Sequence, residues 1–294
     1  MAEYCIGAAQ FGMTYGIANK SGQPNLQEIE KIVKYSIDND IAYIDTAQSY
    51  GDSESNLGSV IKNIPEAKNL KIITKLSPKL QDSSTETIIN SVNASIKKLN
   101  MNSLYGFLAH RVEAIISDDF SRAIEFLKKE KLIIKSGVSV YTPKEALNVI
   151  ENPKIDILQI PINILDKRWV DMGIFELAEK NNIQLFFRSI FLQGIIFLDE
   201  DDLRSRKMDW AIPYLNKFKK LVNNTPFSPI ELAFGVLTKV PGDIVIIMGL
   251  DCSRQLKQNM RIINRSAINK KISDDWWSNL PSFPEKLLNP SLWN

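Results

Sequence analysis

Residues 104–138 read LYGFLAHRVEAIISDDFSRAIEFLKKEKLIIKSGV, and this stretch decides the fold class. It begins with a short apolar run, Leu104–Ala109, and ends with a second one, Ile133–Val138. Neither run alternates with polar residues, which is typical of strands buried on both faces. Between them, Ser117–Lys129 has the apolar spacing of an amphipathic helix that follows a capping serine. The stretch is therefore a strand–helix–strand unit, which favours a parallel sheet.

The same unit repeats along the chain. The other predicted strands are Tyr4–Ala8, Tyr43–Asp45, Ile72–Thr74, Ile157–Ile160, Leu185–Phe187 and Ile244–Met248. The other predicted helices are Asn25–Asn39, Thr85–Leu99, Thr142–Ile150, Val170–Asn181 and Ser253–Ile263. Eight units in 294 residues predict an α/β protein whose sheet closes into a (β/α)8 TIM barrel. The alternative is an open doubly wound sheet, but no Gly-x-Gly-x-x-Gly follows the first strand.

We expect a single domain over residues 1–294, because no stretch rich in Pro, Gly or Ser divides the chain. Residues 191–225 form a longer connection than βα units normally have, with an acidic stretch and a predicted helix near Asp209–Val222. This long loop is a candidate lid or substrate wall. The C-terminal tail, about residues 273–294, carries Trp276, Trp277 and Trp293. We expect the tail to pack over the barrel, with a substrate wall as the alternative.

Composition excludes several classes of protein. The net charge of +2 leaves no electrostatic footprint for nucleic acid or for an anionic membrane face. No apolar run reaches the ~18 residues of a membrane-spanning helix, and the first residues lack the pattern of a signal peptide. Two cysteines and one histidine indicate neither a disulfide framework nor a metal site. We therefore expect a cytoplasmic protein without nucleic-acid, membrane or metal partners.

The single histidine, His110, follows the strand Leu104–Ala109. Asp45 and Tyr50 stand at the end of the strand Tyr43–Asp45 and in the loop after it, and Lys75 follows Ile72–Thr74. In a barrel, such positions share one mouth. Taken singly, each residue has an ordinary structural explanation, but together they suit carbonyl reduction. A tyrosine hydroxyl is a weak acid, an adjacent ammonium favours its phenolate, a carboxylate holds the ammonium, and a neutral imidazole can orient a carbonyl.

The chain resembles the aldo-keto reductases in the segments DTAQSYGDSE, ITKLSP and FLAHR, which hold these four residues. The resemblance begins at IGAAQFGMTYG and continues through GVSVYTP, ILQIPINILD, FRSIFLQG and IMGLDCSRQLKQN. It implies a barrel that binds a nicotinamide dinucleotide without a Rossmann fold. It also implies that Tyr50 is the proton donor, that Lys75 and Asp45 are its partners, and that His110 orients the substrate.

The resemblance also implies cofactor-binding residues. Those for the carboxamide are Ser139 and Gln159, those in the loop over the pyrophosphate are Ser189, Leu192 and Gly194, and those at the adenosine end are Gly249, Gln255 and Asn259. The adenosine residues stand at a predicted helix N-terminus, which suits phosphate. Gln10 and Phe11, after the first strand, are further candidates for lining the pocket.

Two positions depart from the family pattern. Arg188 stands where the family often stacks an aromatic ring on the nicotinamide, and a guanidinium can also stack on a π face. Asp251 stands near the expected position of the 2′-phosphate of NADP, where a carboxylate would repel phosphate and could accept from a free ribose hydroxyl. Arg254 and Lys257 could still supply positive charge there. The cofactor expected from the sequence is therefore NADP(H) or NAD(H).

The leading hypothesis is an NAD(P)-dependent oxidoreductase that reduces an aldehyde or ketone, as a monomer or small homo-oligomer. The opening GAAQFGMTYGIANKSGQP resembles a bacterial branch associated with carbohydrate pathways, which suggests a sugar derivative as substrate. The alternatives are a cofactor-binding regulatory barrel, such as a channel subunit, and a barrel lyase or isomerase without nicotinamide.

Overall fold

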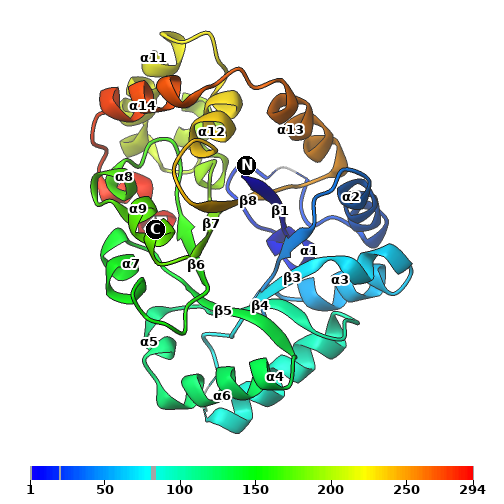
Figure 1. Cartoon of the computed structure of the whole chain (residues 1–294). Coiled ribbons are helices and arrows are strands. Elements are labelled where there is room, and N and C mark those ends of the chain that lie inside the picture. Colours follow the sequence, from blue (N-terminus) through cyan, green and yellow to red (C-terminus); the bar gives the residue numbers. More distant parts are fainter. Residues whose placement is uncertain (1, 20, 81–83, 294) are drawn as a thin grey trace.

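Eight parallel strands close into a barrel in the order in which they occur in the chain, with helices around them (Figure 1). The computed structural model describes residues 2–19, 21–80 and 84–293; residues 1 and 294, at the limits of the predicted domain and tail, lie outside this part. The (β/α)8 barrel predicted from the sequence is confirmed, and the open doubly wound sheet is excluded by the pairing of β1 with β8.

The strands are β1 (Glu3–Gly7), β2 (Tyr43–Asp45), β3 (Lys71–Lys75), β4 (Leu104–Ala109), β5 (Ile133–Ser139), β6 (Ile157–Pro161), β7 (Gln184–Arg188) and β8 (Asp243–Gly249). The α-helices up to β7 are α1 (Ala9–Gly12), α2 (Leu26–Asp38), α3 (Ser53–Ile61), α4 (Thr85–Lys98), α5 (Val112–Ile115), α6 (Asp118–Lys129), α7 (Pro143–Val149), α8 (Arg168–Asp171) and α9 (Ile174–Lys180). Those after β7 are α10 (Glu200–Ser205), α11 (Ile212–Asn223), α12 (Pro229–Leu237), α13 (Ser253–Arg265), α14 (Lys270–Asn279) and α15 (Glu285–Leu288). Short 3-10 helices are η1 (Pro65–Asn69), η2 (Leu192–Phe197), η3 (Asp209–Ala211) and η4 (Pro290–Leu292).

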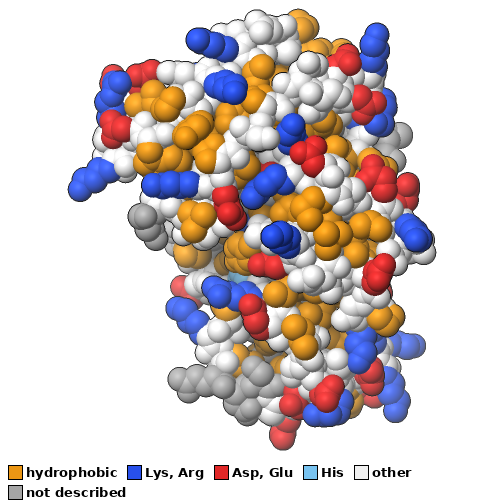
Figure 2. All heavy atoms as spheres, turned by 90° about the vertical axis from the view of Figure 1, so that its left-hand side faces the viewer, with side chains coloured by type: hydrophobic (Ala, Val, Ile, Leu, Met, Phe, Trp, Pro, Cys, Tyr) orange, Lys and Arg blue, Asp and Glu red, His pale blue; other side chains and the backbone are white. Residues whose placement is uncertain are grey.

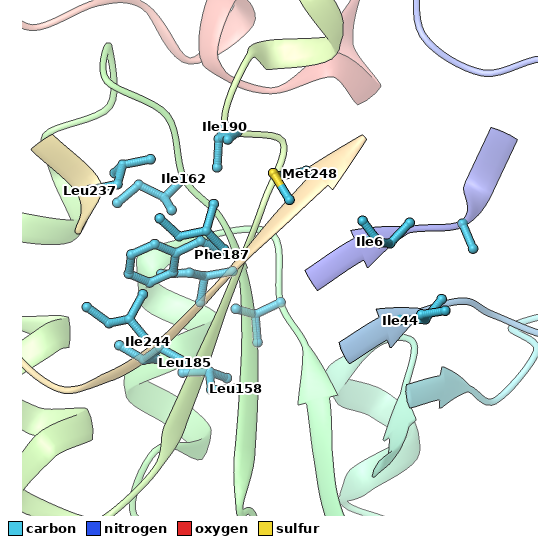
Figure 3. Packing of buried hydrophobic residues seen from close by; sticks show 14 of the residues in the cluster. Ile6, Ile44, Leu158, Ile162, Leu185, Phe187, Ile190, Leu237, Ile244 and Met248 are labelled. Atoms are coloured by element: carbon cyan, nitrogen blue, oxygen red, sulfur yellow. The ribbon is translucent and has the colours of Figure 1, made fainter. Parts of the chain in front are cut away.

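Alternation along the strands separates two apolar cores. Successive side chains of a strand point to opposite faces. One set fills the barrel interior and consists of Cys5, Tyr43, Ile73, Leu108, Ile157, Phe186, Val245 and Ile247. The other set belongs to the larger core between strands and helices; Figure 3 shows Ile6, Ile44, Leu158, Leu185 and Phe187 among its members. The barrel is thus a packed core on which a site can be built at one end.

Aromatic and charged side chains fill the amino end of the barrel. The Tyr43 ring lies edge-on to Tyr105 and to Phe186, with ring centroids 5.3 Å and 5.6 Å apart. Lys71 Nζ donates to the Tyr43 hydroxyl at 2.9 Å, and that hydroxyl donates to Glu3 at 3.1 Å. Because this end is filled, the carboxyl end is the one that offers space for a ligand.

The predicted helices are confirmed with small shifts in their bounds, with one exception. The helix predicted over Val170–Asn181 is wrong as a single element, because Gly173 has a φ of 64° and separates α8 from α9. A left-handed residue cannot continue an α-helix. Asn25, Ser117 and Thr142 cap α2, α6 and α7 through their side chains, as helix starts of these types do.

The long connection after β7 and the C-terminal tail, which are additional to the strand–helix repeat, are largely helical. The long connection over residues 191–225 contains η2, α10, η3 and α11, and the tail contains part of α14 together with α15 and η4. On the face shown in Figure 2, positive and negative side chains are intermingled. None of the helices in the described residues combines the length and hydropathy that a membrane-spanning helix needs.

Candidate active site

The carboxyl end of the barrel interior carries one polar or small residue from each of several strands. Because alternation has a period of two, the residue two positions beyond an interior side chain also faces inward. Tyr43, Ile73 and Ile157 are interior residues, so Asp45, Lys75 and Gln159 form the next layer. By the same rule, this layer includes Gly7, His110, Ser139, Arg188 and Gly249 at or just past the ends of β1, β4, β5, β7 and β8.

Lys75 and Asp45 form a buried ion pair in this layer. Lys75 Nζ donates to both carboxylate oxygens of Asp45, at 2.8 and 2.7 Å, and to the Thr46 carbonyl at 2.8 Å. The side chains are only 1% and 6% exposed. Burial by itself would lower the pKa of Lys75, but the Asp45 carboxylate and Tyr50 outweigh it and raise the pKa. Lys75 therefore carries a full positive charge at neutral pH.

Tyr50 lies against this pair. Lys75 Nζ is 5.0 Å from the centroid of the Tyr50 ring, and the Tyr50 and His110 rings meet edge to face with centroids 6.2 Å apart. Tyr50 and His110 both line the cavity at the carboxyl end. The structure thus brings together the four residues that the sequence singled out.

His110 is held in the neutral form. Its pKa falls from 6.5 to about 4 because of burial first, and then because of the positive charges of Lys75, Arg188 and Arg111. Its Nδ1 lies 3.4 Å from the Ser49 hydroxyl, a partner that sequence reasoning missed. Ser49 precedes Tyr50 in a loop, where no periodic pattern could have indicated its role.

A close approach of two backbones fixes the loop that carries Tyr50. A Cβ atom on Gly12 would lie 1.9 Å from the Tyr50 carbonyl oxygen and 2.2 Å from the Ser53 nitrogen. Gly51 has a φ of 53° and faces the Gly12 carbonyl, which accepts from the Asp52 N–H at 3.4 Å. Only glycine fits at position 12, so the end of α1 sets the position of Tyr50.

A cavity of about 1040 Å³ opens above this layer. Its size lies just above the usual range for ligand pockets, which is roughly 300–1,000 Å³. The predicted residues that line it are Asp45, Tyr50, His110, Ser139, Gln159, Arg188, Ser189, Gly194, Gly249, Asp251, Gln255 and Asn259. Lys75 lies buried behind Tyr50 and Asp45, and the side chain of Leu192 is 1% exposed in the apolar core instead.

Gln10 and Phe11 lie in different environments in the structure. Gln10 lines the cavity, whereas Phe11 is fully buried in the core between strands and helices. The expectation that Phe11 lines the pocket is therefore wrong. Phe11 lies in α1, whose short turn buries this ring while it leaves Gln10 toward the cavity.

The cavity wall contains an unsatisfied polar atom. Gln159 donates from Nε2 to Asp45 at 2.8 Å, and its Oε1 is buried without a hydrogen-bond partner among the described residues. Buried acceptors in proteins are normally paired, so a ligand donor is expected here. A carboxamide N–H would satisfy this atom, so the site fits a nicotinamide group.

The loop after β7 is strained. Ser189, Leu192 and Gln193 have φ values of 61°, 50° and 54°, and Gly194 has a φ of 87°. A Cβ on Gly194 would lie 2.4 Å from that of Ala18, whose N–H donates to the Gln193 carbonyl at 3.4 Å. Strain of this kind gathers at functional sites and persists where the surroundings hold it.

Arg188 is held at the cavity wall by several contacts. Its Nε donates to Ser139 at 3.3 Å and its Nη2 to the Val140 carbonyl at 3.0 Å, while Cζ lies 4.7 Å from the centroid of the Tyr141 ring. The guanidinium is therefore fixed at the cavity wall and packed on a π face. Tyr141 and Tyr15 also line the cavity, and sequence reasoning missed both.

The tail packs on the barrel and also reaches the cavity. Trp276 and Trp277 are 8% and 7% exposed, and Trp276 donates to the Ile164 carbonyl at 2.9 Å, so this part packs on the barrel. Residues 288–291 line the cavity further along. A small pocket contains Ser291 together with Tyr141 and with Arg111, which follows His110 in the chain.

Among residues 2–19, 21–80 and 84–293, no group of three or more His, Cys, Asp and Glu could hold a metal ion. The carboxyl end of the (β/α)8 barrel carries the groups of an acid–base site. These are a tyrosine, a buried lysine–aspartate pair and a neutral imidazole.

Residues 3–276 match the model of the Aldo/keto reductase family, so the chain belongs to this family of oxidoreductases. A search of curated proteins finds no match. Among solved structures, the holo form of an aldo-keto reductase from Bacillus halodurans is 18% identical, with a TM-score of 0.73 and coverage of 96% of this chain and 94% of that one. A glycerol dehydrogenase from Gluconobacter oxydans is 20% identical, with a TM-score of 0.71 and coverage of 96% and 93%. At these identities the likeness shows the fold alone.

Proposed function

We propose that this chain reduces an aldehyde or ketone to an alcohol with a nicotinamide dinucleotide, NADH or NADPH. The observation that carries the proposal is the buried Lys75–Asp45 pair beside Tyr50 and a neutral His110, at one end of a cavity of about 1040 Å³. When bound, the dinucleotide supplies the hydride for the carbonyl carbon. The residues of the chain act on the carbonyl oxygen.

Tyr50 gives its hydroxyl proton to the carbonyl oxygen. This proton completes the new O–H bond of the alcohol, and water returns a proton to the phenolate. The Lys75 ammonium, 5.0 Å from the ring centroid, stabilises the phenolate as it forms. Asp45 holds Lys75 in place through two hydrogen bonds.

His110 orients the substrate. With Nδ1 accepting from the Ser49 hydroxyl, Nε2 carries the ring proton and donates to the carbonyl oxygen. A protonated imidazole would compete with Tyr50 as the acid, and the pKa of about 4 prevents this at neutral pH. His110 therefore serves as a hydrogen-bond donor rather than as the acid.

The dinucleotide would lie along the cavity wall. Ser139 and Gln159 would hold the carboxamide, and Arg188 would flank the nicotinamide. Ser189, Gly194 and the backbone of Leu192 would contact the pyrophosphate, while Gly249, Gln255 and Asn259 would contact the adenosine. All but Leu192 line the cavity. The support from this chain itself is the free Oε1 of Gln159 and the strained loop after β7.

The substrate side suits a small polar carbonyl compound. Tyr15, Tyr141 and Arg188 line the cavity and offer several hydrogen-bond donors. A sugar derivative has the matching hydroxyl groups, and we propose this class of substrate. We further propose that the enzyme works in the cytoplasm as a monomer or a small homo-oligomer, with the described residues forming a single functional domain.

The test is Tyr50→Phe, measured with a panel of aldehydes and ketones and with nicotinamide fluorescence. We expect turnover to fall by about 10²–10⁴-fold, the usual share of a general acid, while dinucleotide affinity is kept. Tyr214→Phe, an exposed tyrosine on α11, is the matched control. Undiminished turnover by Tyr50→Phe would contradict the proposal. Binding of a dinucleotide by the wild type without turnover of any carbonyl would favour the regulatory alternative.

A further inference from the structure

The cavity has a second polar end, which the proposed catalytic residues do not form. One end holds Tyr50 and His110, and the other is formed by residues of β8 and of the α13 helix that follows it. If the nicotinamide must reach the substrate beside Tyr50, the adenosine half of the dinucleotide occupies the α13 end. The assignment of the adenosine half to this end rests on the proposed function.

An unpartnered amide indicates that a polar ligand binds at the α13 end. Asn259 lines the cavity and is only 7% exposed. No hydrogen bond to its side chain is found within residues 2–19, 21–80 and 84–293. Its amide is not among the fully buried polar atoms and is therefore open to the cavity, where it can hydrogen-bond a ligand.

Asp251 places a carboxylate in the wall of this end. Its two oxygens accept from Gln10 Nε2 at 3.4 Å and from Gln255 Nε2 at 3.1 Å. Its backbone N–H donates to Gln255 Oε1 at 2.8 Å, so the carboxylate is held in position from both sides. No lysine or arginine among the described residues forms an ion pair with Asp251.

A second carboxylate occupies the N-terminus of α13. The N-cap residue, Cys252, makes no side-chain cap. Instead Glu28 Oε1, from α2, accepts from the Ser253 N–H at 2.7 Å and from the Ser253 hydroxyl at 2.6 Å. These hydrogen bonds lower the pKa of Glu28, which is therefore ionised at neutral pH. A helix N-terminus ordinarily attracts phosphate, but here a carboxylate of the chain itself has taken that role.

Among the described residues, the cations on α13 form no ion pair with Asp251 or Glu28. Lys257 Nζ lies 5.6 Å from the centroid of the Tyr35 ring, toward α2. Arg254 is exposed. Arg261 reaches the cavity, but it stands eight residues beyond Ser253, or about 12 Å along the helix axis. The first turn of α13 is therefore bordered by two carboxylates. Asp251 has no ion pair with a lysine or arginine among the described residues, and Glu28 pairs through Oε2 with Lys31 Nζ at 3.3 Å. The Lys31 side chain is largely exposed, so this pair is screened by solvent and leaves much of the negative charge of Glu28 in place.

We propose that Asp251 and Glu28 make the adenosine end selective for NAD(H), a dinucleotide with a free 2′-hydroxyl, and exclude the 2′-phosphate of NADP(H). A carboxylate accepts a hydrogen bond from a ribose hydroxyl and repels a phosphate dianion. Glu28 adds to the repulsion by removing the anion-binding capacity of the helix N-terminus. Selectivity then comes from a repulsive element against the competitor as well as from attraction.

The experiment compares the dissociation constants of NADH and NADPH, followed by nicotinamide fluorescence without any substrate. We expect wild-type protein to bind NADH at least about tenfold more tightly than NADPH. Asp251→Asn and Glu28→Gln keep the size of the side chains but remove the charges, and each should tighten NADPH binding. NADH binding should stay nearly unchanged in Glu28→Gln and weaken in Asp251→Asn, which loses the carboxylate that accepts from the ribose hydroxyl. Glu30→Gln, a half-buried residue on the same helix that pairs with Lys34, is the matched control.

The salt dependence of the two dissociation constants is a second readout. Salt would not change the preference for NADH if Asp251 and Glu28 had a purely structural role. Screening weakens repulsion between partly exposed charges, so the preference of the wild type for NADH should shrink as ionic strength rises. Equal affinities in the wild type, tighter binding of NADPH, or variants that leave the ratio unchanged would each overturn the inference alone. Failure of the wild type to bind either dinucleotide would overturn the proposed function, and this inference with it.

Discussion

His110 shows how one position in a barrel acquires its chemistry. It follows β4, so it faces a mouth that also holds Lys75 and Arg188. The burial of the ring and these charges act in the same direction on its pKa, since all disfavour the imidazolium. Asp45 contributes its charge mainly to Lys75, because both of its oxygens accept from that ammonium. The site thus keeps a charged lysine and a neutral histidine close together.

The depressed pKa of His110 predicts a pH dependence of stability. The unfolded chain takes up this proton near pH 6.5, whereas the folded chain resists protonation until about pH 4. Between these values the unfolded state binds more protons, so the free energy of unfolding falls as the pH falls, by at most about 1.4 kcal/mol per pH unit. Urea unfolding of the wild type and His110→Gln at pH 7, 5.5 and 4 measures the effect.

The comparison of the two proteins isolates His110 from the carboxylates that titrate in the same range. The free energy of unfolding of the wild type minus that of His110→Gln should stay constant above pH 6.5. It should decrease as the pH falls from 6.5 to 4. A difference that does not vary with pH over this window would mean that His110 has an ordinary pKa in the folded protein.

At the scale of elements, the loop after β2 depends on the helix after β1. Gly12, the last residue of α1, touches the backbone of Tyr50 and Ser53. Ser53 in turn donates to the Ala8 carbonyl at 2.7 Å. The backbone around Tyr50 is thus anchored to the first strand–helix connection, although about forty residues of chain lie between them.

Gly12→Ala should therefore reduce turnover as well as stability. The added methyl group would meet the Tyr50 carbonyl oxygen at 1.9 Å, so α1 and the Tyr50 loop must separate. Overpacking of this kind costs typically about 1–3 kcal/mol. We expect a matching loss of unfolding free energy, and a drop in kcat for the folded fraction at nearly unchanged dinucleotide affinity.

Gly58→Ala is the control for this prediction. Its Cβ would meet the Lys98 carbonyl oxygen, also at 1.9 Å, where α3 packs on α4 and away from Tyr50. Both variants should lose stability, but only Gly12→Ala should lose kcat. An equal loss of kcat in the two variants would show that Gly12 does not position Tyr50.

Helices with a single apolar face were predictable from the sequence. A helix that is apolar on every face is difficult to predict. Asn25 and Ser117 precede regular apolar stripes, so α2 and α6 could be placed from the sequence. The α12 helix was missed because Leu232–Leu237 are all buried, which removes the contrast between faces. The capping box formed by Ser228 and Glu231 could have indicated its start.

At the scale of the whole molecule, the sequence predicted the catalytic end because barrel geometry converts strand ends into neighbours. Asp45, Lys75 and His110 needed only the strand assignments. The adenosine end needed more, since Glu28 meets Ser253 across 225 positions and Gln10 meets Asp251 across 241. Such side-chain pairs depend on the packing of α2, α13 and β8, which a single sequence does not specify.

The end of the tail lines the cavity, and we expect its removal to affect substrate binding more than cofactor binding. Asn289 and Ser291 line the cavity, and Ser291 shares a small pocket with Tyr141 and with Arg111, the residue after His110. A chain that ends at Pro284 lacks α15 and η4 and loses the buried Leu287 and Leu288. We expect KM for the best carbonyl substrate to rise about tenfold or more, with the dissociation constant of the preferred dinucleotide within about twofold of the wild type.

Trp276→Phe separates this effect from a general loosening of the tail. It removes the hydrogen bond to the Ile164 carbonyl and keeps most of the ring contact with Phe218, at a position outside the cavity. Removing one such bond costs about 1 kcal/mol of stability. KM should therefore stay at the wild-type value in Trp276→Phe while the melting temperature falls. If the truncated chain and Trp276→Phe raise KM alike, the tail acts by holding the barrel together; if only the truncation does, residues 288–291 form part of the wall that recognises the substrate.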